Sequence, residues 1–171
     1  MSEVKISEKR LKLYSAFQKQ ATSFKFLFFL IMKLPSAFFS GVRVVSFSNE
    51  SCKTSVPYKW FSQNPFKSTY FACQAMAAEL STGLPAIMAI EKRNPRVSML
   101  VVDMEATFVK KAVGLTIFEC VSVVDIINAV EKAVETGEGQ TVKSKVIGLD
   151  TKGNEISIFY FTWSFKAKQK K

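Results

Sequence analysis

A single carboxylate, Glu79, stands in the most apolar helix-forming segment of the chain. The segment is STYFACQAMAAELST, residues 68–82, in which small and apolar residues surround the acid. Burial in such surroundings raises the pKa of a carboxyl group, because desolvation disfavours its charged form. A carboxylate of this kind can take a proton from an attacking water or act itself as a nucleophile. The alternative for Glu79 is a structural role, such as pairing with a lysine across a subunit contact.

Asn64 is the second polar side chain that could take part in chemistry. It lies fifteen positions before Glu79, in an Asn-Pro pair of the kind found in turns. Its amide could orient a water or a substrate, or it could only stabilise the turn.

The cysteine and histidine content limits the chemistry further. The chain has no histidine, which excludes histidine-based triads and the usual zinc sites. It has three cysteines, Cys52, Cys73 and Cys120, and no CxxC pair. This pattern indicates free thiols in a reducing compartment, so we expect a cytoplasmic protein. Cys73 lies beside the candidate site but has no histidine to activate it, and we expect a packed thiol.

The charge balance favours an anionic partner. Lys and Arg number 24 against 14 Asp and Glu, a formal net charge of +10, which suits nucleic acid, an acidic membrane surface or a phosphate-bearing metabolite. Most aromatic residues stand in apolar surroundings instead of alternating with the positive charges, so we expect no nucleic-acid partner. The apolar run FLFFLIM, residues 26–32, is shorter than the ~20 residues of a membrane span. We expect it to be the buried end of an amphipathic N-terminal helix.

The candidate residues depend on one central helix for their positions. Residues 68–82 have helix-forming composition, with Ser68 as the expected N-cap and Gly83 followed by Pro85 as the expected stop. Strands are predicted before it at 41–47 and 53–60, and Pro57 suggests that the second is irregular or at a sheet edge.

Strands also dominate the chain after the central helix. Residues 102–110 alternate as a strand with one buried face, strands follow at 115–122, 141–149 and 155–166, and a short helix is predicted at 125–137. The last strand carries an aromatic face on which the central helix can pack. We therefore predict an α+β domain spanning 1–171, with a helical extension at 1–33 and a disordered basic tail at 167–171.

This order of elements resembles the hotdog fold, in which a curved antiparallel sheet wraps around a central helix. The resemblance is to acyl-CoA thioesterases of the phenylacetate-pathway type, which carry an Asn and, fifteen positions later, an Asp or Glu on the central helix, as Asn64 and Glu79 do. It extends over MKLPSAFFSGVRV, EATFVKKAVG and DTKGNEISIF, and so covers most of the chain from about residue 32. The family's His-Gly-Gly at the helix start is replaced by Tyr70-Phe71-Ala72, so the chain looks closest to an uncharacterised branch.

The resemblance implies hydrolysis of an acyl thioester. Glu79 would be the base or the nucleophile, and Asn64 would position the water or the thioester. The free N–H groups at the helix start, around Tyr70, Phe71 and Ala72, would polarise the carbonyl.

The resemblance also implies how substrate and subunits are arranged. Lys110, Lys111 and Arg96 lie near strand ends and would contact the phosphates of coenzyme A. Coenzyme A enters as part of the substrate, and we expect no other cofactor. Relatives build the acyl pocket between subunits, so we expect a homodimer or tetramer.

Two other functions stay open at this point. A noncatalytic carrier of acyl or lipid groups is favoured by the replacements at Tyr70 to Ala72, because a side chain at Phe71 can project where a glycine leaves space. A binder of nucleic acid or of an anionic surface is the third, and it predicts an affinity that falls steeply with added salt.

Overall fold

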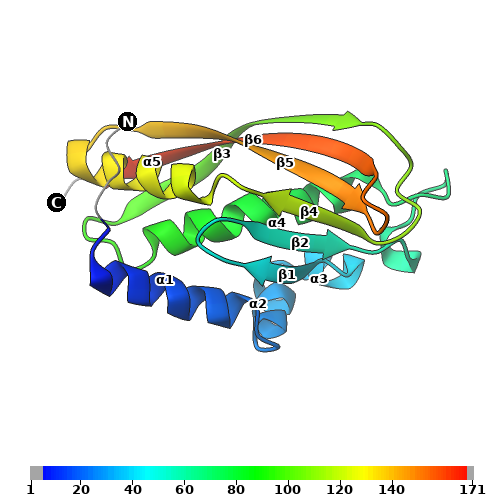
Figure 1. Cartoon of the computed structure of the whole chain (residues 1–171), viewed down its shortest axis with the longest axis horizontal. Helices are drawn as coiled ribbons and strands as arrows, with labels where there is room; N and C mark the ends of the chain where they lie inside the picture. Colours follow the sequence, from blue (N-terminus) through cyan, green and yellow to red (C-terminus); the bar gives the residue numbers. More distant parts are fainter. Residues whose placement is uncertain (1–5, 169–171) are drawn as a thin grey trace.

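The computed structural model describes residues 6–168. Six strands form one antiparallel sheet in the order β1-β2-β4-β5-β6-β3, and the sheet curves around helix α4 (Figure 1). The strands are β1 (Arg43–Phe47), β2 (Cys52–Val56), β3 (Val97–Phe108), β4 (Thr116–Cys120), β5 (Gln140–Asp150) and β6 (Glu155–Ala167). The helices are α1 (Glu8–Ala21), α2 (Phe26–Lys33), α3 (Pro35–Ser40), α4 (Phe71–Ile90) and α5 (Val123–Thr136), with a short 3-10 turn, η1 (Trp60–Ser62).

The central helix is longer and begins later than the sequence predicts. Ser68 is not its N-cap; it lies in the preceding turn, and Tyr70 is the residue that caps α4. Gly83 and Pro85 do not end the helix, and both are buried within it. The segment after them remains apolar, and its residues Ala86, Met88 and Ala89 are buried, so tertiary burial outweighs the weak helix propensity of the two residues.

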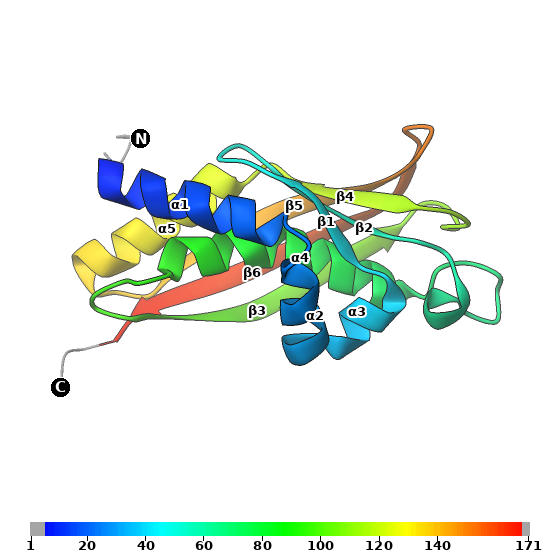
Figure 2. The same ribbon diagram turned by 90° about the horizontal axis from the view of Figure 1, so that it is seen from below.

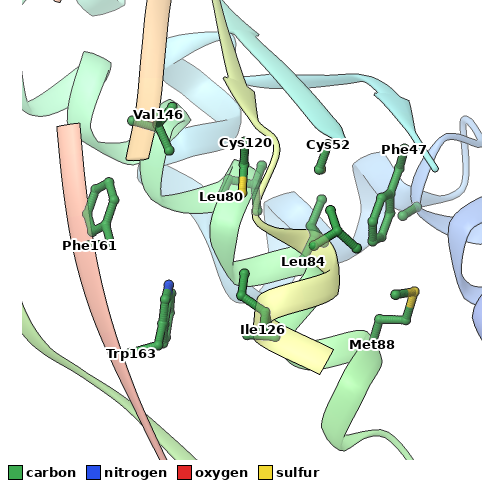
Figure 3. Packing of buried hydrophobic residues seen from close by; sticks show 14 of the residues in the cluster. Phe47, Cys52, Leu80, Leu84, Met88, Cys120, Ile126, Val146, Phe161 and Trp163 are labelled. Atoms are coloured by element: carbon green, nitrogen blue, oxygen red, sulfur yellow. The ribbon is translucent and has the colours of Figure 1, made fainter. Parts of the chain in front are cut away.

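The core lies between α4 and the inner face of the sheet (Figure 3). Leu80, Leu84 and Met88 of α4 meet Trp163 of β6 and Ile126 of α5. The predicted aromatic wall of β6 is confirmed, since all four of its inward-facing aromatic side chains are buried: Phe159, Phe161, Trp163 and Phe165. The three cysteines are buried and free.

Residues 6–33 of the predicted N-terminal extension form two helices, α1 and α2, and not one, and α3 follows them. The break after α1 coincides with Thr22 and Ser23, whose hydroxyls donate to the carbonyls of Gln18 and Gln20 and so compete with the helical backbone. Helices α1 to α3 lie on the side of α4 opposite β3, β5 and β6 (Figures 1 and 2).

Helix α2 departs from the prediction of a buried run. Only Phe26 and Leu30 of α2 are buried, and four of its apolar side chains are exposed, Phe28, Phe29, Ile31 and Met32. The reason is that eight residues give the helix a single packing face, while its sequence is apolar all round. Within residues 6–168, no helix combines the length and the hydropathy needed to cross a membrane.

Strand β3 forms one edge of the sheet. The prediction that residues 102–110 bury one face is not met within this chain, because Met104 and Phe108 are exposed as well as the polar residues that alternate with them. Pro57 follows the end of β2, which lies between β1 and β4 and so is not an edge strand. Of the predicted tail, Ala167 is the last residue of β6, while 169–171 lie outside the described residues.

Candidate active site

The start of α4 offers two unpaired backbone donors. Cys73 and Gln74 donate to the carbonyl of Tyr70, as expected in the first turn of a helix, and the N–H of Tyr70 donates to Ser62 O at 2.7 Å. Within the described chain, the N–H groups of Phe71 and Ala72 have no hydrogen-bond acceptor. They lie at the positive end of a 20-residue helix dipole, which favours a negatively charged oxygen nearby.

A cavity of about 550 Å³ opens beside this helix start. Asn64, Tyr70, Phe71, Lys110 and Lys111 line it, so it unites five of the residues predicted from the sequence. Its floor comes from the turn that precedes α4, and its opposite wall comes from the end of β3 and the segment that follows.

Asn64 organises the turn that leads into α4. Its Oδ1 accepts hydrogen bonds from the N–H of Phe66, the N–H of Ser68 and the hydroxyl of Ser68, at 3.0 to 3.2 Å. These contacts hold the side chain beside the cavity and leave its Nδ2 group as the donor available to a ligand. Asn64 therefore has the turn role, and its amide still lines the site.

Aromatic rings form the lip of the cavity. Tyr70 and Phe71 pack edge to face with centroids 4.8 Å apart, and Phe71 packs against Phe108 of β3 at 6.4 Å. The Phe71 side chain is 53% exposed. It is therefore directed towards the mouth of the cavity, where a glycine would leave open space.

Gln74 is a cavity residue that sequence reasoning missed. It is buried, its Nε2 donates to Thr69 O at 3.2 Å, and its Oε1 accepts from Ser157 Oγ at 2.9 Å. Thr69 in turn donates its N–H to Ala112 O at 2.7 Å. This network fixes the start of α4 against β6 and against the cavity wall. Gln74 is the only residue with a side-chain amide in the apolar segment 68–82, and this feature of the sequence could have identified it.

The three predicted phosphate-binding cations do not lie together. Lys110 and Lys111 line the cavity, and the Nζ of Lys111 donates to Phe66 O at 3.2 Å. Arg96 immediately precedes β3, whereas these lysines follow its end, so the length of a 12-residue strand, roughly 40 Å, separates them. Arg96 is therefore far from the cavity within one chain.

Glu79 lies further along α4, in a different hollow. It lines a cavity of about 210 Å³ together with Met76 and the α2–α3 junction around Leu34. Burial raises the pKa of the Glu79 carboxyl above its ordinary value of 4.5. In the described part of the chain no side chain pairs with this carboxylate.

Gly83 makes room for the Glu79 carboxylate. A Cβ at position 83 would stand 3.2 Å from Glu79 Oε1 and 3.6 Å from Trp163 Cζ2. The carboxylate is thus held against the helix surface, one turn after its own Cα and near the β6 aromatic wall. Beneath it, the Trp163 indole N–H donates to Thr82 Oγ1 at 2.9 Å.

Glu79 and the helix start are separate within one chain. Seven residues divide Glu79 from Ala72 along α4, which corresponds to about 10 Å of helix. The two groups also line different cavities. A reaction that needs both groups at one carbon therefore requires a second chain to bring one of them.

No protein-family model and no curated protein sequence matches this chain. Its fold is similar to that of several solved structures. One is a probable thioesterase of unknown function, PA5026 from Pseudomonas aeruginosa, with a TM-score of 0.68 and 17% identity over 98% of this chain and 100% of that one. Another is thioesterase PA1618 from the same organism, with a TM-score of 0.65 and 12% identity over 89% and 99%. At these identities the likeness establishes the fold, and the predicted hotdog fold is confirmed.

A third similar structure comes from Staphylococcus aureus. SAV0944 from Staphylococcus aureus has a TM-score of 0.56 and 11% identity over 75% of this chain and 96% of its own, and it was crystallised with a glutamate changed to alanine. A structure of another variant of the same protein, described as a thioesterase enzyme, carries alanine in place of a glutamine.

Proposed function

We propose that this protein hydrolyses an acyl thioester, with coenzyme A as the thiol carrier. The observation that carries the proposal is a pair of free amides, those of Phe71 and Ala72, at the start of a buried helix that also bears a carboxylate with a raised pKa. The cavity of about 550 Å³ beside these amides is large enough for a thioester group and part of its acyl chain. The likeness in fold to thioesterases adds support.

The helix amides would stabilise the oxygen that becomes negative during attack. A thioester oxygen within hydrogen-bond distance of Phe71 N and Ala72 N gains both donors and the helix dipole, and these interactions strengthen as charge develops on the oxygen. Neither donor depends on side-chain identity. The replacement of glycines at these positions therefore leaves this part of the chemistry intact.

Glu79 would promote attack on the carbonyl carbon of the thioester by one of two routes. As a base it takes a proton from water, which attacks the carbonyl carbon and releases the thiol; as a nucleophile it forms an anhydride that water then cleaves. Both routes need the carboxylate, so both need a pH above its raised pKa. Nδ2 of Asn64 would orient the water or the thioester, and Lys110 would contact a phosphate of the carrier.

A homodimer would bring the two halves of the site together. Glu79 and the Phe71 amide are too far apart in one chain, and β3 presents an unpaired edge of 12 residues. Two copies that pair along this edge extend the sheet and cover its exposed apolar side chains. The proposed reaction needs a dimer in which the carboxylate of one subunit lies beside the helix start of the other.

The test is thiol release from a panel of acyl-CoAs of increasing chain length, measured with the full chain and its Glu79→Gln variant. We expect turnover by the wild type, with a rate that rises with pH through a pKa above 4.5. The Gln variant should lose about 100-fold or more in kcat, the usual effect of removing a general base. Glu138→Gln, an exposed glutamate beyond α5, is the matched control and should keep full activity.

Two results would count against this proposal. Equal turnover by the wild type and Glu79→Gln removes Glu79 from the chemistry. Absence of turnover in both, together with saturable binding of fatty acids or acyl-CoAs, favours the noncatalytic carrier.

The carrier function has an observation of its own. The Phe71 ring projects at the cavity mouth and packs between Tyr70 and Phe108, so it narrows the approach to the backbone amides. An aromatic lip suits retention of an apolar chain better than rapid release of product. Replacement of Phe71 by glycine separates the two functions, because it should speed turnover in an enzyme and only weaken ligand retention in a carrier.

A further inference from the structure

The side of the molecule formed by α2, α3 and η1 carries an unusual density of exposed aromatic residues. Phe24 is 77% exposed, Phe28 65%, Met32 76% and Trp60 74%. We call this surface the basic aromatic face; its apolar members are Phe24, Phe28, Met32, Phe39, Trp60 and Phe61, and its cations are Lys25, Lys33 and Lys59.

The apolar members form connected groups and are not scattered singly. The rings of Phe24 and Phe28 pack at 6.4 Å. Phe39 of α3 packs on Phe61 of η1 at 5.7 Å, and Phe61 packs on Trp60 at 4.7 Å. Helices α2 and α3 pack against each other, so the two groups lie on adjoining elements, as Figure 2 shows from this side of the molecule. Connected apolar surface of this kind marks an interaction site.

The part of the chain that contains this face carries most of the net positive charge. Residues 9–78 contain ten Lys or Arg and a single acid, Glu50, so they carry +9 of the formal net charge of +10. Lys25 and Lys33 flank α2, Lys59 precedes η1, and Lys12 and Lys19 are exposed on the neighbouring α1. None of these five lysines pairs with a carboxylate within residues 6–168. A partner for this face must therefore be both anionic and able to accept aromatic side chains.

We propose that the basic aromatic face binds the surface of an anionic lipid bilayer. Lipid headgroups would supply the negative charge around the lysines, and the layer beneath them would take up Phe28, Met32 and Trp60. Tryptophan and phenylalanine with flanking lysines are the residue types that such an interface favours. Helix α2 is apolar all round but far too short to span, so the contact is peripheral.

A second copy of the chain fits this face less well. A symmetric contact would set Lys25, Lys33 and Lys59 against the same residues of the other copy, and no acid within the face would offset the repulsion. The inference rests on other observations than the proposed hydrolysis, although Lys33 of this face also lines the hollow that holds Glu79. Membrane binding would have one consequence for the proposed hydrolysis. The carbonyl of Ser62, the last residue of η1, accepts a hydrogen bond from Tyr70 N, so a bilayer at this face would lie beside the aromatic rings at the mouth of the larger cavity.

Vesicle binding tests the proposal directly. The full chain is sedimented with phosphatidylcholine vesicles and with vesicles that contain three parts in ten phosphatidylglycerol. We expect binding to the anionic vesicles only, with an affinity that falls as salt is added. Trp60 is a built-in reporter, because its emission should shift to the blue on binding while the buried Trp163 contributes an unchanged background; Trp60→Phe should bind with no shift.

Two matched sets of variants separate the apolar and the charged parts. Serine at Phe24, Phe28 and Met32 should weaken binding by about ten-fold or more, whereas serine at the equally exposed Val113, Val121 and Val124 should not. Glutamine at Lys25, Lys33 and Lys59 should weaken it on the order of 100-fold. Glutamine at Lys132, Lys145 and Lys152, which are exposed elsewhere, should weaken it far less.

Each other outcome overturns the proposal. Equal binding to neutral and anionic vesicles would show that the lysines do not select an anionic bilayer. Binding to neither would show that this face does not bind a bilayer. Tighter binding to duplex DNA, unaffected by the serine changes, assigns the face to a nucleic acid. Conversion of an oligomer into monomers by the serine changes assigns it to a subunit contact. Thiol release in solution without vesicles is measured alongside, so that failure of this inference is distinguishable from failure of the hydrolysis.

Discussion

At the scale of single residues, burial of Glu79 disfavours the charged form of its carboxyl group. Its carboxyl has a raised pKa, and desolvation is the cause. Gly83 gives the carboxylate its space, but the described chain supplies it with no charged partner. An ionised Glu79 therefore costs stability, which is typical of a group kept for function.

This cost gives a stability prediction for Glu79→Gln. The folded state binds the Glu79 proton more tightly than the unfolded state, so the wild type loses stability as pH rises from 4.5 through the raised pKa. The Gln variant has no such loss. We expect its free energy of unfolding at pH 8 to exceed that of the wild type by about 1 kcal/mol, the low end of what an uncompensated buried polar group costs.

Denaturant unfolding at a series of pH values measures this difference. The difference in free energy of unfolding between Glu79→Gln and the wild type should vanish below pH 4.5, where Glu79 is protonated in both the folded and the unfolded state. Glu138→Gln, which changes an exposed glutamate, should stay within about 0.5 kcal/mol of the wild type throughout. A Glu79→Gln variant less stable than the wild type at pH 8 would mean that an interaction stabilises the charged form.

At the scale of elements, side-chain hydrogen bonds fix α4 in the curved sheet along its length. Thr54 of β2 donates to Ala77 O at 2.6 Å, Ser157 of β6 donates to Gln74, and Trp163 of β6 donates to Thr82. Close apolar packing already limits how a helix can lie on a sheet. These directional bonds add to it and help to hold the start of α4, and with it Phe71, in position.

The two tryptophans give a matched test of this anchoring. Trp163 is 3% exposed and Trp60 is 74% exposed. Trp163→Phe removes the donor to Thr82 and leaves a small gap, and we expect it to lower the free energy of unfolding by about 1–3 kcal/mol. Trp60→Phe should leave stability unchanged within about 0.5 kcal/mol. Equal effects in thermal unfolding of the two variants would show that the bond to Thr82 does not anchor α4.

At the scale of the whole molecule, the sheet has two unequal edges. The edge formed by β1 has five residues, whereas the edge formed by β3 has 12 and carries exposed Leu100, Val102 and Met104. A long apolar edge left open invites aggregation, so proteins cover or pair such edges. We expect pairing with the β3 strand of a second copy.

Sedimentation of the chain tests this pairing. A chain of 19.2 kDa should sediment as a species of about twice that mass, or of a higher multiple for a tetramer. Lysine in place of both Val102 and Met104 should shift the population towards monomers. Val45→Lys, on the opposite edge strand β1, should leave it unchanged. A wild type that remains at 19.2 kDa at micromolar concentration would contradict both the pairing and the shared site.

Local sequence patterns predict the main elements of the fold and five of the residues that line the larger cavity. The aromatic alternation of β6, the turns at Gly137 and Gly153, and the small, apolar composition of α4 are local patterns, and local patterns report secondary structure and burial. Asn64 lies in the turn before α4, Phe71 at the start of α4 and Lys110 just after β3, and the three line one cavity.

Tertiary contacts set the length of α4, the exposure of α2 and β3, and the distances between the predicted site residues. Gly83 and Pro85 indicate a stop when propensity is considered alone, but burial of the residues around them outweighs that preference. Spacing along a sequence does not give separation in space. Glu79, Ala72 and Arg96 are therefore not among the residues that line the larger cavity, whereas the other five predicted residues are. Exposure depends on which surfaces other elements cover, and for α2 and β3 this chain has no further element that covers them within the described residues.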